Sequence, residues 1–130
     1  MRKLDPREEA RKFREGLEHF NHGRFFEAHE AWEAIWLPAA EPEKMFVQGI
    51  IQVAAAFHHL QRSNRRGAQS LLEAGLHKLE RFPRTHHGIR VEKLRAAARR
   101  WLAALTANEE SLREEFPRIE RVKRRKVARE

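Results

Sequence analysis

Cysteine is absent from the 130 residues of the chain, which excludes disulfide bonds, thiolate metal ligands and thiol nucleophiles. Long hydrophobic runs are absent too, because the longest apolar stretch, Gly49 to Phe57, is short and is interrupted by Gln52. The first residues, MRKLDPREEARKF, lack the apolar centre of a signal peptide. We therefore expect a cytoplasmic protein without a membrane span.

No segment alternates apolar and polar residues with a period of two, so the sequence predicts no sheet. The abundant residues, Ala, Leu, Glu, Lys and Arg, favour helix, and a chain with 41% hydrophobic and 35% charged residues is typical of a globular protein. A chain of this length has room for a single core. The predicted fold class is therefore all-α.

Prolines, glycines and asparagines mark the expected ends of the helices. Asp5 and Pro6 form a typical helix start, and the segments NHG, PAAEPE, SNRRG and PRTHHG are predicted to separate one helix from the next. The five predicted helices span Pro6 to about Phe20, Arg24 to Leu37, about Glu43 to Arg62, about Gly67 to Phe82, and about Val91 to Leu105.

The two turns that contain Asn21 and Asn64, which lie 43 residues apart, resemble each other weakly. This spacing indicates a compact helical bundle of two stacked antiparallel hairpins plus a fifth helix. We assign residues 1–117 to this bundle domain.

The net charge of +8 is concentrated near the C-terminus. Residues 118–130 contain seven basic and two acidic residues, a net charge of +5, and are predicted to form a basic C-terminal tail. One interpretation is that the tail attracts nucleic acid or an acidic protein surface. The other is that it is only a solvated terminus.

The stretch FFEAHEAWEAIW, Phe25 to Trp36, sets ionisable groups among aromatic residues. On a helical projection, His29 and Glu33 lie inside the apolar arc of the second helix. Buried carboxylates need partners. We therefore predict that His29 and Glu33 are largely buried, lie within reach of each other, and are joined by a partner from the third helix. The predicted polar cluster comprises His29, Glu30, Glu33, Gln48 and His58.

The same stretch, followed by QGIIQVAAAFHH and NRRGAQSLL, resembles the small all-helical prokaryotic family known as domain of unknown function 309. The family pattern is aromatic-Glu-x-His-Glu-x-x-Glu-x-x-Trp, then Gln-Gly and an Ala-Ala-x-x-His type of spacing. The resemblance covers roughly Leu17 to Leu105 and implies a compact helical fold, without an established activity. By position, the family-defining residues are Phe26, Glu27, His29, Glu30, Glu33, Trp36, Gln48, Gly49, His58, Asn64, Gly67 and Ala68.

Three interpretations of the polar cluster stay open. His29, Glu30, Glu33 and His58 could hold a divalent metal, although the second histidine of a zinc-protease motif is missing. Alternatively, Glu33 could orient His29 for acid–base chemistry on a small molecule. The third interpretation is a structural network in which these groups and a tryptophan indole satisfy one another and fix the helix register.

We expect a small helical binding or interaction module whose polar cluster has an unknown ligand. The alternatives are a metal-dependent or acid–base enzyme that uses this cluster, and a nucleic-acid accessory protein that uses the basic tail. His86 and His87, in a polar turn, are interpreted as solvated loop residues.

Overall fold

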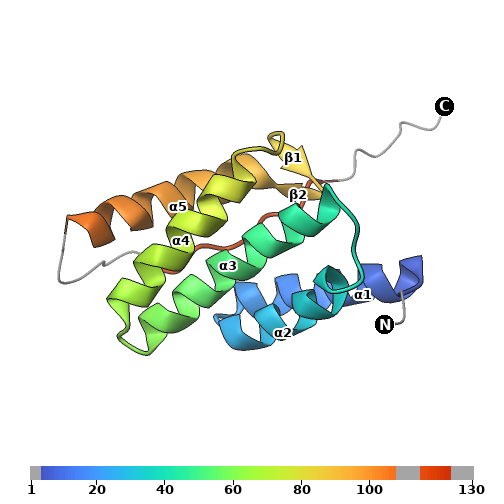
Figure 1. The fold of residues 1–130 in the computed structure, drawn as a ribbon, viewed down its shortest axis with the longest axis horizontal. Coiled ribbons are helices and arrows are strands. Elements are labelled where there is room, and N and C mark those ends of the chain that lie inside the picture. Colours follow the sequence, from blue (N-terminus) through green and yellow to red (C-terminus); the bar gives the residue numbers. More distant parts are fainter. Residues whose placement is uncertain (1–3, 108–114, 124–130) are drawn as a thin grey trace.

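The structure, a computed structural model, describes residues 4–107 and 115–123 of the chain. Each helix packs against the next one along the chain, so that the helices form two antiparallel hairpins followed by a fifth helix (Figure 1). The elements are α1 (Pro6–Asn21), α2 (Phe25–Trp36), α3 (Glu43–Gln61), α4 (Arg65–Leu79), β1 (Thr85–His86), β2 (Ile89–Arg90) and α5 (Val91–Thr106).

The predicted all-α class is confirmed, and the expectation of no sheet is wrong in one place. Strands β1 and β2 form a small antiparallel hairpin between α4 and α5. His87 and Gly88 turn the chain there with φ values of 52° and 76°, the left-handed region that two-residue hairpin turns require. None of the helices within residues 4–107 and 115–123 is long and apolar enough to cross a membrane.

The start of α1 follows the predicted capping pattern. The Asp5 side chain accepts hydrogen bonds from the backbone N–H groups of Arg7 and Glu8, each at 2.9 Å. These bonds satisfy two of the donors that every helix leaves open at its N-terminus, and Pro6 needs no partner there.

The turns after α1 and α3 have the same backbone hydrogen bonds. Arg24 N donates to His19 O at 2.8 Å, and Asn64 N donates to His59 O at 2.8 Å. The two turns therefore correspond at an offset of 40 residues, rather than the 43 that separate Asn21 from Asn64. The two-hairpin architecture follows from this repeated turn.

The centre of the molecule is aromatic. Trp32 is fully buried, and its indole N–H donates to the Phe13 carbonyl at 3.2 Å. A Cβ at Gly16 would overlap the Trp32 indole, so this glycine makes room for the largest core side chain. Deeper along the bundle, Phe57 of α3 packs edge-on against Trp101 of α5 at 5.5 Å.

Helices α3 and α4 approach each other closely at two glycines. A Cβ at Gly75 would lie 2.9 Å from the Gly49 carbonyl oxygen, and a Cβ at Gly49 would lie 3.1 Å from Leu79. Since neither position has room for a side chain without a shift, the pair fixes how tightly α3 and α4 pack.

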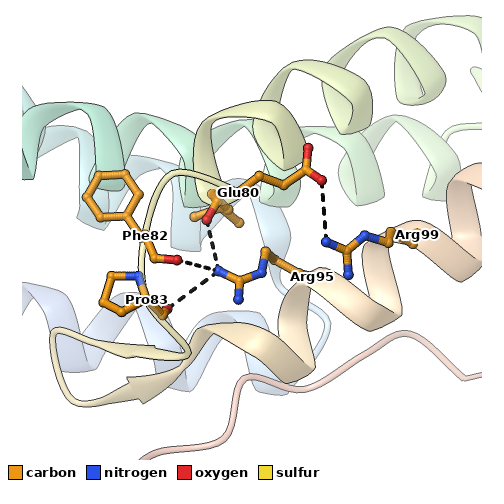
Figure 2. Close-up of polar contacts among 6 residues, drawn as sticks. Glu80, Phe82, Pro83, Arg95 and Arg99 are labelled. Atoms are coloured by element: carbon orange, nitrogen blue, oxygen red, sulfur yellow. Dashed lines mark hydrogen bonds and ion pairs between the residues drawn. The ribbon is translucent and has the colours of Figure 1, made fainter.

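The end of α4 is capped from α5. Arg95 Nη1 donates to the carbonyls of Leu79 at 3.0 Å, Phe82 at 2.7 Å and Pro83 at 3.4 Å, and Figure 2 shows its guanidinium reaching toward this turn. A cation near the last carbonyls of a helix satisfies unpaired acceptors and opposes the negative end of the helix dipole. Helix α4 therefore ends at Leu79, earlier than the predicted Phe82.

Residues 115–123 form an extended segment, which we call the C-terminal strap. It crosses the bundle and ends beside β2 (Figure 1). Phe116 stacks on Trp101 at 5.2 Å, and Ile119 is only 2% exposed. Arg90 N donates to Glu120 O at 2.8 Å, which adds backbone pairing to the hairpin.

The strap corrects the expectation that residues from Arg118 onward are only a solvated terminus. Ile119 belongs to the hydrophobic core, whereas Arg118, Glu120 and Arg121 are exposed. The remainder of the predicted basic tail, residues 124–130, lies outside the described residues.

Candidate functional site

A small cavity lies between α2 and α3 in the region where the sequence predicts a polar cluster. Its volume is about 130 Å3. Helix α2 supplies one wall and α3 the other. The lining residues are His29, Glu33, Trp36, Gln48, Ile51 and Gln52.

His29 and Glu33 are one turn apart on α2 and form an ion pair if His29 is protonated. His29 Nε2 lies 3.7 Å from Glu33 Oε2. The two side chains thus lie within reach of each other, and Gln48 and Gln52 of α3 line the same cavity, although neither is hydrogen-bonded to His29 or Glu33 among the described residues. The prediction that both are largely buried is not met, because the His29 and Glu33 side chains are half-buried, at 31% and 44% exposed. The carboxylate keeps contact with water and avoids the cost of full burial.

Unpartnered polar atoms gather at this cavity. Five buried side-chain nitrogen or oxygen atoms in the described residues have no hydrogen-bond partner. Three of them, His29 Nδ1, Trp36 Nε1 and Gln52 Oε1, belong to residues that line it. Each such atom costs about 1–3 kcal/mol relative to a satisfied one. The fully satisfied network considered from the sequence is therefore not formed among the described residues.

The chemistry of these atoms is complementary to a molecule with both donors and acceptors. The Trp36 indole can only donate, whereas Gln52 Oε1 can only accept. If the His29 proton is on Nε2, toward Glu33, then Nδ1 is a further acceptor. The unpartnered atoms thus include both a donor and acceptors, with a carboxylate at the side of the cavity.

The other predicted site residues are placed away from the cavity. Helices α2 and α3 run antiparallel, so that Phe26, and not His29, lies level with His58, with ring centroids 5.5 Å apart. Glu27 and Glu30 are exposed and do not line the cavity. The four residues considered as metal ligands are therefore not brought together. Within residues 4–107 and 115–123, no three His, Asp or Glu side chains are placed to hold a metal ion.

Several family-pattern residues have structural positions instead. Asn64 is the N-cap of α4, and its side chain accepts from Gly67 N at 3.0 Å. A Cβ at Gly67 would lie 2.6 Å from Asn64 Nδ2, so the cap and the glycine fit each other. Ala68 is fully buried in the core.

A second polar cluster was not predicted from the sequence. His86 Nε2 lies 2.8 Å from Glu43 Oε1, and His87 Nδ1 lies 3.2 Å from Glu43 Oε2. Both rings also pack on buried Phe46, with centroid distances of 4.6 and 6.0 Å. The interpretation of His86 and His87 as solvated loop residues is therefore wrong. Their partner lies more than forty positions earlier in the chain, and no local signal in the sequence joins them.

Larger hollows occur elsewhere on the molecule. One of about 470 Å3 lies along α1 beside Arg121, and one of about 600 Å3 lies between Gly88 and the strap residues Arg121 to Lys123. None of the unpartnered buried atoms belongs to their lining. The smaller cavity is therefore the better candidate for a binding site, because residues with unpartnered buried polar atoms line it.

Comparison with known families agrees with the resemblance in the sequence. The family model described as "Domain of unknown function (DUF309)" matches residues 13–71, which include α2, α3 and the whole cavity lining. The resemblance to domain of unknown function 309 is thereby confirmed over this part of the chain. A search of curated proteins gave no match.

Proposed function

We propose that this protein is a binding module that holds a small polar molecule in the cavity between α2 and α3. One observation carries the proposal: three of the five unpartnered buried polar atoms belong to residues that line this cavity. Folded proteins satisfy almost all buried polar groups, and exceptions are often associated with ligands or catalysis. A ligand that supplies the missing partners offsets that cost.

The size and the chemistry of the cavity define the class of ligand. A volume of about 130 Å3 corresponds to roughly four water molecules in the liquid, so the ligand, or the part of it that enters, has only a few heavy atoms. Gln52 Oε1 and the Glu33 carboxylate call for N–H donors, and the Trp36 N–H calls for one acceptor. A primary amide or a small amine with a neighbouring oxygen meets both requirements.

The proposal is tested by nuclear magnetic resonance with the intact protein and three small probes: acetamide, ethanolamine and acetate. Acetamide and ethanolamine are expected to shift the indole N–H resonance of Trp36, while Trp32 and Trp101 serve as internal references. Acetate is expected to leave it unchanged, because its negative charge would lie beside the Glu33 carboxylate. If none of the three probes shifts Trp36 selectively, the proposed function is wrong and the cavity holds only water.

Two substitutions separate binding from folding. Gln52→Leu removes an unpartnered buried acceptor and keeps a similar volume, so it is expected to abolish probe binding without lowering the free energy of unfolding. Gln69→Leu, on the surface of α4, is the matched control and is expected to leave probe binding unchanged.

One observation also favours acid–base chemistry at the same cavity. The Glu33 carboxylate lies 3.7 Å from His29 Nε2, where it can hold the ring proton on this nitrogen and leave Nδ1 to exchange a proton with a bound molecule. His29→Gln would then abolish turnover of a bound substrate while retaining binding, whereas a pure binding module has no turnover to lose.

A further inference from the structure

The exposed edge of α2 beside α3 combines apolar ends with an acidic centre. Phe26, Glu30, Glu33 and Leu37 follow the spacing i, i+4, i+7 and i+11, which places them on one side of a helix. Phe26 is 47% exposed and Leu37 is 43% exposed, and both are large hydrophobic residues. Leu37 caps α2 with helical dihedral angles, so it continues the same face. We call these four residues the α2 face.

The charge of α2 is opposite to that of the whole chain. The chain contains 27 Lys and Arg residues and has a net charge of +8, yet α2 contains three glutamates and neither Lys nor Arg. In the described part of the chain, Glu30 and its neighbour Glu27 form no ion pair. Glutamates three residues apart repel each other by about 0.2–0.5 kcal/mol per pair. Glu27 lies in the first turn of α2, where the helix dipole favours a negative charge, and Glu33 lies beside His29. Glu30 has neither compensation, and a local cost of this kind is typical of a functional surface.

The aromatic end of this face is held in place. The Phe26 ring stacks on the His29 ring at 6.0 Å with an interplanar angle of 18°, and the His58 ring lies 5.5 Å from it. An exposed aromatic side chain whose rotamer is already fixed loses little entropy when a partner covers it.

We infer that the α2 face docks a basic amphipathic helix of a partner protein, with Phe26 and Leu37 as apolar anchors and Glu30 and Glu33 facing Lys or Arg. The anchors span about 16 Å along the axis, which is three turns and suits helix-to-helix recognition through i, i+4, i+7 and i+11 contacts. The acidic centre selects a basic partner and increases the rate of encounter.

The negative charge of the α2 face also excludes two other binding partners for it. A second copy of α2 packed against this face would place glutamates against glutamates, and nucleic acid would place phosphates there. The surface adjoins the cavity and shares Glu33 with it, but docking does not require a ligand in the cavity. The inference therefore goes beyond the proposed function and can fail separately from it.

The test is a selection from a displayed library of helical peptides randomised at four positions of one face, i, i+4, i+7 and i+11, with the full-length protein as target. We expect selected peptides to carry apolar residues at the outer two positions and Lys or Arg at the inner two. Affinity of a selected peptide is then measured by fluorescence anisotropy at low and at moderate salt, and it is expected to fall as salt rises.

Variants assign the binding to this face. Glu30→Lys and Phe26→Ser are each expected to weaken binding by about tenfold or more, which corresponds to about 1.4 kcal/mol. Both positions are exposed, so we expect the two variants to fold. Circular dichroism of each variant tests whether the helices are retained. Glu73→Lys, an exposed change on α4, is the matched control and is expected to leave affinity unchanged. Gln52→Leu is expected to keep peptide binding even though it abolishes probe binding in the cavity.

Four outcomes would overturn the inference. They are the selection of no helical peptide, the selection of peptides without basic residues, peptide binding that Glu30→Lys and Phe26→Ser leave unchanged, and loss of peptide binding in Gln52→Leu. The last outcome would place the peptide in the cavity and leave the proposed function standing.

Discussion

The side-chain amide of Asn21 forms two hydrogen bonds with the backbone of Ile119, which is 98 positions later in the chain. Asn21 Nδ2 donates to the Ile119 carbonyl at 3.1 Å, and Ile119 N donates to Asn21 Oδ1 at 2.7 Å. The last residue of α1 thus supplies the strap with the two hydrogen bonds that a neighbouring β-strand would supply. These bonds attach the strap to the first helix of the bundle.

Replacement of Asn21 by Ala is expected to lower the free energy of unfolding by about 1–3 kcal/mol, because it leaves partly buried backbone groups of Ile119 without partners. Asn21→Asp keeps the acceptor and loses the donor, so it should fall between wild type and Asn21→Ala. Urea denaturation measures both differences. Equal stability of wild type and Asn21→Ala would show that these two hydrogen bonds contribute nothing to the free energy of unfolding.

Ile119 and Val122 form a matched pair within the strap, since one is 2% exposed and the other 42%. Ile119→Ala is expected to cost about 2–4 kcal/mol through lost burial and the cavity left behind. Val122→Ala should change stability by less than about 0.5 kcal/mol. Thermal unfolding of the two variants compares them directly, and similar losses would contradict the buried position of Ile119.

The helices could be predicted because their signals are local. Pro6 and the acidic first turn mark the start of α1, and Asn64 with Gly67 marks the start of α4. The end of α4 was misplaced because a distant side chain, Arg95, determines it. Propensity within the helix contains no information about a cap supplied from another helix.

The hairpin was missed and the strap was anticipated only in part, as a cover of a core edge that Ile119 and Val122 could form. Of these two residues, Ile119 is buried and Val122 is exposed. Strands of two residues are too short to show a period of two, although the pair His87 and Gly88 is the kind of turn signal that favours a hairpin. The strap depends on contacts such as that between Asn21 and Ile119, which only the folded chain brings together.

The candidate site was predicted in part. Helical periodicity placed His29 and Glu33 on the side of α2 that meets α3, and this position is confirmed. Which residues of α2 and α3 meet depends on how far one helix is shifted along the other. A helical projection of each helix alone gives no information about this shift. For this reason Gln52 faces the cavity with His29, whereas His58 contacts Phe26.

Arg95 and Arg99 lie one turn apart on α5 and have different partners (Figure 2). Arg95→Met removes the donor for the carbonyls that end α4 and is expected to cost about 1–3 kcal/mol. Arg99→Met removes only an exposed ion pair with Glu80, at 3.3 Å, and should cost less than about 1 kcal/mol. Chemical denaturation of both variants tests the difference, and the opposite order would refute the capping role of Arg95.

Lys93 attaches the strap to α5 through Glu120, with Nζ 2.8 Å from Oε2. The hydrogen bond from Lys93 lowers the pKa of the Glu120 carboxyl below its ordinary value of 4.5. Partial desolvation opposes this shift, and the positive charges of Lys93, Arg90 and Lys123 add to it. The charged form of Glu120 is therefore favoured more strongly in the folded chain than in the unfolded one.

A lowered folded-state pKa means that this contact contributes fully above pH 4.5 and is lost as the pH falls through the folded-state pKa of Glu120. Lys93→Met is expected to move the titration midpoint of the Glu120 carboxyl carbon upward toward 4.5, measured by nuclear magnetic resonance. Lys123→Met removes the smallest of these charge effects and should move the midpoint less. In wild type, protection against hydrogen exchange of the Arg90 and Val122 backbone amides, which donate across the contact between the strap and the hairpin, should decrease in the same acidic range. An unchanged midpoint in Lys93→Met would mean that the strap is held at this end by its backbone bonds to Gly88 and Arg90 alone.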